Sequence, residues 1–513
     1  MLTPTSHQLW SLLREWYGVS GGVSTPGHVQ GEGPGGYKFP LAGTKETLGG
    51  AEAKRSPPDT PYHSPFIELA SFPRIQPTRF SAEKRYLCTM RRLLTTTFLA
   101  LAALAAAAQE EAKTGWVFTP MPDVSYNSDI GLNLGGFCDF FYYGDGKDYP
   151  NFQHHIAVCG AWATKGSWYL HGLFDSKTLV PGARVTGSLT YRDASMNNFY
   201  GFNGLHSPYF PELDLNQETR TAYYTDHRRV LRAAVTIQKP VAGNLSLMAG
   251  AVLRGIAISD FDLKNYDNQE TLYRFYQRVD LIHPDESKGG DNLEGRIGLT
   301  YDSRDIEWVP NRGVYGELYV NGNWDFTFGK YHYAQLVGHF RHFVPIVFNR
   351  LTFAYHLGLQ HTFWGEMPWY NLNEISNLIY QYEEYEGLGS RYTIRGYKYN
   401  RIMAAGYAWG NFELRAKVLQ FNLFKQHFDL VINPFYDIAA ITREYRPEEH
   451  AKMKSLTDTR RIWQDADERF YHSAGIGGKI HMNTNFILSL EVGKGFNPQL
   501  SDLTVAMATT YLF

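Results

Sequence analysis

The chain has little cysteine, no excess of either charge and, beyond residue 108, no long hydrophobic run. Three cysteines occur in 513 residues, and the alternation around Cys138 and Cys159 places these two on opposite faces of a sheet. Such cysteines cannot pair without backbone movement, so we predict no disulfide. A formal net charge of −2 gives no indication of a nucleic-acid partner. The missing hydrophobic runs exclude a bundle of transmembrane helices, each of which needs about 20 apolar residues.

Residues 90–108 have the pattern of a secretory signal peptide. A basic start precedes the apolar run Phe98–Ala108, which ends in small residues suited to cleavage and is too short to cross a bilayer as a helix. Residues 1–89 are rich in Pro, Gly, Ser and Thr and show no sustained apolar periodicity. We expect them to be an over-extended gene model or a disordered extension, with 109–513 as the mature chain.

Aromatic residues and glycine are abundant. The chain has 35 Tyr, 32 Phe and 48 Gly, yet its mean hydropathy is only −0.35. Two classes of secreted protein have this composition. One is the large soluble all-β protein, and the other is the outer-membrane barrel, whose strands alternate and therefore never look hydrophobic on average.

Apolar and polar residues alternate in many segments of about ten residues, as in a barrel that turns apolar side chains to lipid and polar ones to its lumen. At the C-terminus, one face carries Leu503, Val505, Met507, Thr509, Tyr511 and Phe513. A soluble sandwich also alternates, but it turns the apolar face inward. The signal peptide, the terminal Phe513 and the many tyrosines favour the membrane. Trp116, Trp324 and Tyr511 are then expected in the aromatic girdles at the membrane surfaces.

Alternation predicts an all-β fold, a 16-stranded antiparallel transmembrane β-barrel. The predicted strands are 114–125, 128–142, 151–164, 167–176, 183–193, 221–237, 243–258, 291–303, 310–324, 330–344, 349–363, 407–422, 428–441, 471–481, 484–494 and 503–513. Long connections follow odd-numbered strands, at 194–220, 259–290, 364–406 and 442–470, and short ones follow even-numbered strands. Extracellular loops and periplasmic turns of outer-membrane barrels differ in the same way.

The connection 364–406 contains the segment Ile394-Arg395-Gly396-Tyr397 after a glycine-rich stretch. Two following strands each offer one carboxylate on the polar face, Glu413 and Asp437. Carboxylates at about 2.8 Å would hold the planar guanidinium of Arg395 in one geometry, as a loop folded into the lumen requires. The alternative is three unrelated surface charges. Other charges on polar faces are expected to be solvated wall residues, among them Arg228, Arg232, Arg254, Glu317, Arg415 and Lys417.

These motifs resemble those of the BamA/TamA-type outer-membrane assembly family, also called bacterial surface antigens. Ile394–Tyr397 matches the family's loop motif of aliphatic, Arg, Gly and aromatic residues. Tyr301–Asp305 with Pro310–Gly313 is similar to a turn between its strands. Phe435–Ala439 is similar to a strand motif in which Ala439 replaces glycine. The resemblance covers about 114–513.

The resemblance implies an extracellular loop that folds into the lumen, where Arg395 contacts Glu413 and Asp437 on the inner wall. It also implies that Tyr511 and Phe513 serve as a C-terminal assembly signal. Typical members carry periplasmic POTRA domains before the barrel. Here only 109–113 separates the expected cleavage site from the first strand, so the chain resembles barrel-only members.

The leading hypothesis is a role in the insertion or export of other outer-membrane proteins. Its physical basis is a weak seam between 114–125 and 503–513, since Pro120 and Pro122 lack ladder donors and a client strand could pair there. The alternatives are a passive or gated pore and a structural surface antigen.

The sequence indicates neither an enzyme nor a cofactor. It has no Gly-x-Ser-x-Gly and no His-Glu-x-x-His motif, and the adjacent His154 and His155 on a strand would point to opposite faces, unsuited to one metal. The expected partners are outer-membrane lipid, client barrel proteins and periplasmic accessory proteins. We expect a monomeric barrel in the bacterial outer membrane.

Overall fold

The computed structural model describes residues 113–127, 131–147, 149, 151–214, 221–264, 266–267, 270–307, 309–378, 387–390, 392–423, 426–453, 463–464, 469–482, 486–497, 500, 503–508, 511 and 513. The expected signal peptide at 90–108 and the segment 1–89 lie outside these residues. The predictions made for them therefore remain predictions.

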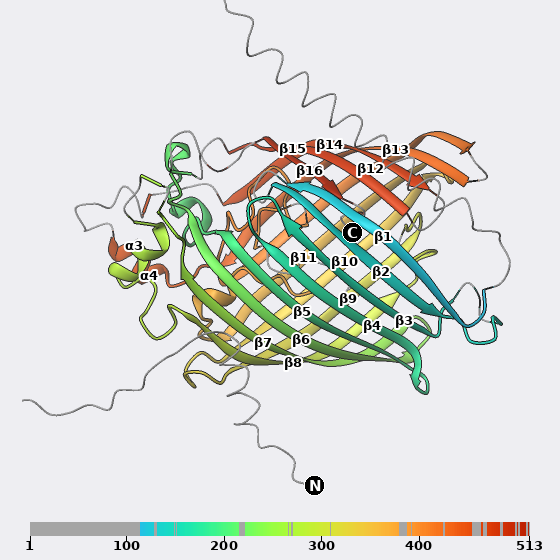
Figure 1. The fold of residues 1–513 in the computed structure, drawn as a ribbon, viewed down its shortest axis with the longest axis horizontal. Helices are drawn as coiled ribbons and strands as arrows, with labels where there is room; N and C mark the ends of the chain where they lie inside the picture. The colour runs from blue at the N-terminus through green and yellow to red at the C-terminus, as the bar shows by residue number, and fades with distance from the viewer. Residues whose placement is uncertain are drawn as a thin grey trace, which may run out of the picture. The chain divides into compact units, whose positions relative to one another are not determined.

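The described residues form a closed antiparallel β-barrel in which each strand pairs with its neighbours in the chain and β1 pairs with β16 (Figure 1). Its strands are β1 Trp116–Asn127, β2 Gly131–Tyr142, β3 His154–Ala163, β4 Trp168–Val180, β5 Ala183–Asn198, β6 Thr225–Ala242, β7 Leu245–Asp260, β8 Gly289–Asp302, β9 Gly313–Asp325, β10 Tyr333–Val347, β11 Leu351–Gly365, β12 Gly406–Leu423, β13 Gln426–Arg443, β14 Phe470–Met482, β15 Phe486–Gly495 and β16 Leu503–Ala508. Each corresponds to one predicted strand, so the predicted fold is confirmed.

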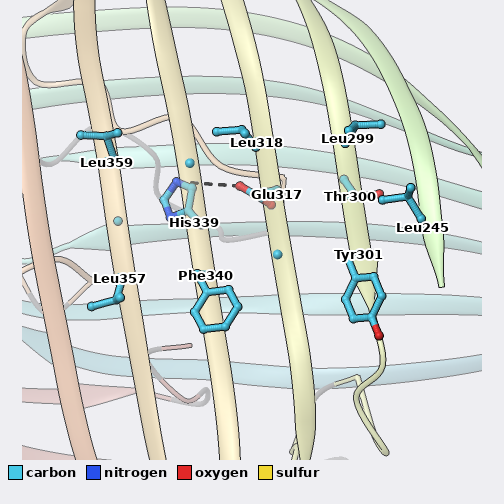
Figure 2. A pocket seen from close by; sticks show the side chains of 13 residues that line it. Leu245, Leu299, Thr300, Tyr301, Glu317, Leu318, His339, Phe340, Leu357 and Leu359 are labelled. Carbon is cyan, nitrogen blue, oxygen red and sulfur yellow. Dashed lines mark ion pairs between the residues drawn. The ribbon is translucent and has the colours of Figure 1, made fainter.

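The barrel turns its apolar side chains outward and its polar side chains inward. On β9, Leu318 is exposed, whereas Glu317 is buried. Figure 2 shows the same division across neighbouring strands: Leu318, Phe340 and Leu357 lie on the outer face, while Glu317 pairs with His339 on the other side. A soluble sandwich turns its apolar side chains inward. Apolar side chains on the outer face therefore indicate a surface that contacts lipid.

Other expectations about side-chain placement also hold. Cys159 is buried, Cys138 is partly exposed on the adjacent strand, and both are free thiols, as predicted. Trp116 and Trp324 are half exposed on the outer surface, which suits the girdle positions expected of them. Among the described residues, no helix is long and apolar enough to cross a membrane.

The long connections gather at one end of the barrel, here called the loop end, and the short turns lie at the other, the turn end (Figure 1). The long connections carry η1 Gly204–His206, η2 Pro211–Leu213, α3 Leu272–Arg278, η3 Trp369–Asn371 and α4 Pro447–Lys452. Their rings pack into a buried aromatic cluster that includes Phe199, Phe202, Tyr276, Trp369, Tyr370 and Tyr445. The loops thereby build an apolar core of their own over the polar lumen.

The C-terminus departs from prediction. Among the described residues, β16 comprises Leu503–Ala508, whereas Tyr511 and Phe513 lie outside any strand and are buried in the barrel and not on the lipid face. Tyr511 therefore is not a girdle residue. The physical reason lies in buried cations: the guanidinium of Arg415 lies 4.1 Å from the centre of the Tyr511 ring and 4.9 Å from that of Phe513. Cation–π attraction is strongest where water is excluded.

Candidate functional site

The connection 364–406 folds into the barrel, and its tip rests against the inner wall. A backbone bridge joins Leu388 to Ile402, and both side chains are fully buried. Gly389 has φ +101°, a conformation that other residues rarely adopt, and a Cβ there would lie 2.3 Å from the carbonyl oxygen of Lys398. The glycine-rich stretch thus makes the tight return that presents Arg395 to the wall.

Arg395 is held by two carboxylates on adjacent strands. Its Nε and Nη2 donate to Asp437 at 2.9 and 2.8 Å, its backbone N–H donates to Asp437 at 3.0 Å, and its Nη1 donates to Glu413 at 2.6 Å. The guanidinium also lies 3.5 Å from the centre of the Phe435 ring. The structure therefore brings together the three charged residues that the sequence singled out. In the ladder, Glu413 faces Phe435 and Asp437 faces Asn411, so the two carboxylates are diagonal and not directly opposite.

The charges around Arg395 balance. Arg415 donates to Glu413 at 2.8 Å, Lys479 pairs with Glu491 at 2.6 Å, and Arg395 lies 3.5 Å from Glu491. The set contains three cations and three carboxylates, all nearly fully buried. Burial acts to lower the pKa of Arg395, but Asp437 and Glu413 outweigh it and raise that pKa above its ordinary value. A permanently charged guanidinium suits a structural tie, because removal of either partner would strand a buried charge.

The neighbours of Arg395 bind the last strands of the barrel. The N–H of Gly396 donates to Thr504 Oγ1 of β16 at 3.0 Å, and the carbonyl of Gly396 accepts from Gly495 N of β15 at 3.2 Å. A Cβ on Gly396 would lie 2.6 Å from Gly495 N, so only glycine permits this approach. Tyr397 donates to the carbonyl of His472 on β14 at 2.9 Å, and Ile394 is fully buried. One short segment thus contacts every strand from β12 to β16.

The C-terminal residues join the same network. Arg415 Nη2 donates to the carbonyl oxygen of Phe513 at 3.0 Å, and the Tyr511 hydroxyl lies 2.8 Å from His481 Nε2. A chain of contacts therefore links Arg395 through Glu413 and Arg415 to Phe513. The assembly-signal role expected of Tyr511 and Phe513 remains a prediction.

Most of the wall charges expected to be solvated are in fact buried, and the inward loop contacts three of them, whereas Lys417 is only partly buried and pairs with Asp429 at 3.0 Å. Arg228 donates to the carbonyl of Tyr370 at 3.0 Å, and Arg254 pairs with Glu374 at 2.6 Å. Glu317 accepts from the N–H of Leu378 at 3.0 Å. Alternation placed these side chains on the correct face, but it carried no information about a loop that covers them.

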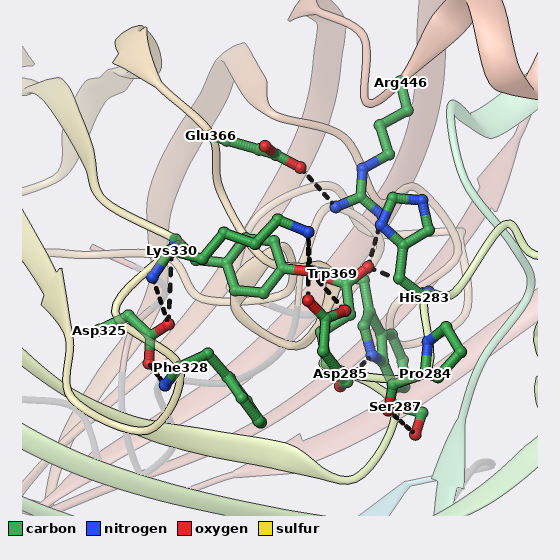
Figure 3. Close-up of polar contacts among 12 residues, drawn as sticks. His283, Pro284, Asp285, Ser287, Asp325, Phe328, Lys330, Glu366, Trp369 and Arg446 are labelled. Carbon is green, nitrogen blue, oxygen red and sulfur yellow. Dashed lines mark hydrogen bonds and ion pairs between the residues drawn. The ribbon is translucent and has the colours of Figure 1, made fainter. Parts of the chain in front are cut away.

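Another buried carboxylate, Glu286, lies in the loop end and was not singled out from the sequence. It accepts from the backbone N–H of Trp369 at 3.1 Å and from Arg446. Nη2 of Arg446 also reaches Glu366 at 2.7 Å, as Figure 3 shows. Burial raises the pKa of Glu286, opposed by Arg446. Glu286 thus ties three long connections together, and their large sequence separation leaves no local signal.

The seam between β1 and β16 is short. Among the described residues, the two strands pair at Tyr126–Met507 and Asn127–Ala506, whereas β1 pairs with β2 along its whole length. Pro120 and Pro122 lie on β1 away from the paired part of the seam. The described residues contain no cluster of His, Cys, Asp or Glu placed to hold a metal ion.

The Omp85 superfamily domain matches residues 160–493. Among solved structures, BamA from Haemophilus ducreyi lacking POTRA domains 1–3 is similar with a TM-score of 0.49 and 15% identity, over 78% of this chain and 70% of that one. CdiB from Escherichia coli is similar with a TM-score of 0.48 and 11% identity, over 79% of this chain and 64% of that one. None of the curated proteins matches this chain. Because the superfamily domain covers most of the barrel, the chain belongs to the Omp85 superfamily, and the barrel lies in the bacterial outer membrane.

Proposed function

We propose that this barrel assists the insertion or export of other outer-membrane proteins, and that the β1–β16 seam is where it does so. The observation that carries the proposal is the contrast in ladder length: the described residues have two paired positions at the seam, whereas β1 pairs with β2 along the whole strand. A short ladder leaves backbone donors and acceptors at a strand edge for a client strand.

The rest of the structure supports a seam that opens while the barrel persists. The charge network around Arg395 holds β12 to β16 to the loop, and Glu286 holds the loop end together. The inward loop occupies the lumen, which argues against the alternative of a wide passive pore. Client barrel proteins and periplasmic accessory proteins are the partners that this function requires.

A disulfide that locks the seam tests the proposal. Tyr126→Cys with Met507→Cys, in a background where Cys138 and Cys159 are serine, places one thiol on each strand at a paired position. We expect oxidation to lower the abundance of other barrel proteins in the outer membrane, and reduction to restore it. Ala249→Cys with Ile297→Cys, a paired position within the β7–β8 ladder, is the control and should have no effect.

Undiminished assembly with the seam fully oxidised would refute the proposal. Single-channel recording separates the pore alternative, because steady and large conductance of the wild-type protein would favour passive transport over assembly. The surface-antigen alternative predicts neither conductance nor any change in the abundance of other barrels.

A further inference from the structure

Strand β12 continues past the strand beside it at the turn end. The β11–β12 ladder runs from His361–Gly406 to Leu351–Ala416, and Lys417 N then donates to Arg350 O at 2.8 Å. From there β12 extends to Leu423, paired only with β13 on its other side. Within the described part of the chain, no strand pairs with the β11 side of 418–423. This segment is here called the free edge.

The free edge is amphipathic. The pairing of β12 with β13 shifts by one residue between Lys417 and Leu419. Beyond this shift, Gln420 lies on the polar face of the strand and donates to Asp429 at 2.8 Å. Phe421 stacks on Phe428 of β13 with ring centres 5.2 Å apart. The exposed fractions of the apolar side chains are 52% for Val418, 52% for Leu419, 40% for Phe421 and 43% for Leu423.

The turn between β10 and β11 adds to this surface. It lies beside the start of the free edge, since its Arg350 carbonyl accepts from Lys417. Ile346 and Val347 at the end of β10 are 56% and 50% exposed, and Phe348 in the turn is 71% exposed. Apolar side chains and an unpaired strand edge therefore occur together at the turn end, which faces the periplasm in outer-membrane barrels.

Neither lipid nor water can accommodate both the unpaired backbone groups and the apolar side chains of the free edge. A tilted strand crosses the bilayer core in about 9–11 residues, which the β11–β12 ladder from 406 to 416 already supplies. Unpaired backbone groups are excluded from hydrocarbon because nothing there bonds to them. Water would bond to them but would leave the apolar side chains of 418–423 exposed. An added strand satisfies the backbone and covers the side chains together.

We propose that the free edge 418–423 binds an extended segment of a second protein by β-strand addition. Edges that avoid pairing usually carry proline, inward-pointing charges or several lysines, and 418–423 has neither proline nor charge. The bound segment must itself alternate, with apolar residues beside Leu419 and Phe421 and polar residues beside Gln420. This site lies on β12, away from the β1–β16 seam, and does not depend on seam opening.

Site-specific photocrosslinking in native outer membranes tests the proposal. A benzophenone amino acid replaces Phe421 on the free edge or, as the matched control, Phe340 on β10. Both side chains are 40% exposed on the outer face, but β10 is paired on both sides. We expect a protein adduct from position 421 and only lipid adducts from position 340, and locking the seam should leave the 421 adduct unchanged.

The identity of the adduct decides the result. Mapping of the crosslink to an extended, alternating segment of another protein supports the proposal. Lipid adducts alone at 421, an adduct to a second copy of this chain, or the same protein adduct at both positions would overturn it.

Hydrogen exchange on the purified full chain provides a second measurement with a defined probe. The probe is a synthetic peptide of about eight residues that alternates valine and threonine, compared with a peptide of the same composition plus a central proline. We expect the alternating peptide to slow exchange in 418–423 by about tenfold and the proline peptide to have no effect. No protection with either peptide, or protection confined to the seam strands, would contradict the proposal.

Discussion

The β12–β13 region and the β1–β16 seam are built in opposite ways. At β12–β13, a long ladder is reinforced from inside by Arg395, which bonds to Glu413 and Asp437. At the seam, the ladder that the structure describes consists of the pairs at Tyr126 and Asn127. Sixteen strands of similar composition thus differ in how firmly they are joined, and the difference lies in buried side-chain bonds and ladder length rather than in hydrophobicity.

The two regions are nevertheless connected. Thr504 on β16 accepts a hydrogen bond from Gly396, the residue next to Arg395, and the C-terminal Phe513 bonds to Arg415, which also bonds to Glu413. Besides its ladder with β15, the last strand is therefore fastened from the lumen as well as by its two described pairs with β1. Breaking these contacts one at a time measures how much each contributes.

The largest effect should follow Arg395→Ala. The substitution leaves Glu413 and Asp437 buried with fewer partners, and the loss of one partner of a buried ion pair costs about 3–5 kcal/mol. We expect a lower unfolding midpoint in urea and new protease cleavage near 387–400 as the loop leaves the wall. Arg395→Lys, which keeps the charge without the planar fork, should lose less. Cleavage like that of the wild type would show that the tie does not hold the loop.

Arg415→Met should have the next largest effect, about 1.5–3 kcal/mol, the usual range for hydrogen bonds to charged groups. Arg395 still neutralises Glu413, but Phe513 loses both its donor and its cation. Tyr511 loses Arg415 and keeps Lys479, whose Nζ lies 4.8 Å from the centre of its ring. Faster removal of Phe513 by carboxypeptidase, followed by mass spectrometry, would measure the release. Arg415→Lys retains the cation near Tyr511 and should restore part of the protection. If the terminus of Arg415→Met resists digestion as before, other contacts hold it.

Sequence reasoning succeeded where the physical signal was local. A period of two reports which face meets lipid, so it located all the strands and placed Glu413 and Asp437 on the lumen side. It failed for Tyr511, whose position continues the outward phase of Leu503, because the cation that draws it inward lies on β12. Sequence reasoning also did not identify Glu286, because its partners Trp369 and Arg446 lie far from it in the sequence.

The smallest effect, and the one that bears most directly on the seam, should come from Thr504→Val. Valine matches threonine in shape and strand preference, but it accepts no hydrogen bond from Gly396 and donates none to the Gly493 carbonyl, a loss of about 1 kcal/mol for each bond. The barrel should therefore unfold at nearly the same urea concentration, while the amides of β16 exchange faster. Thr236→Val, on the lumen side of β6 and away from the seam, is the control. If β16 exchanges at the wild-type rate in Thr504→Val, then the loop does not restrain the seam through this bond, and the connection between the two regions must run through Arg415 and Phe513.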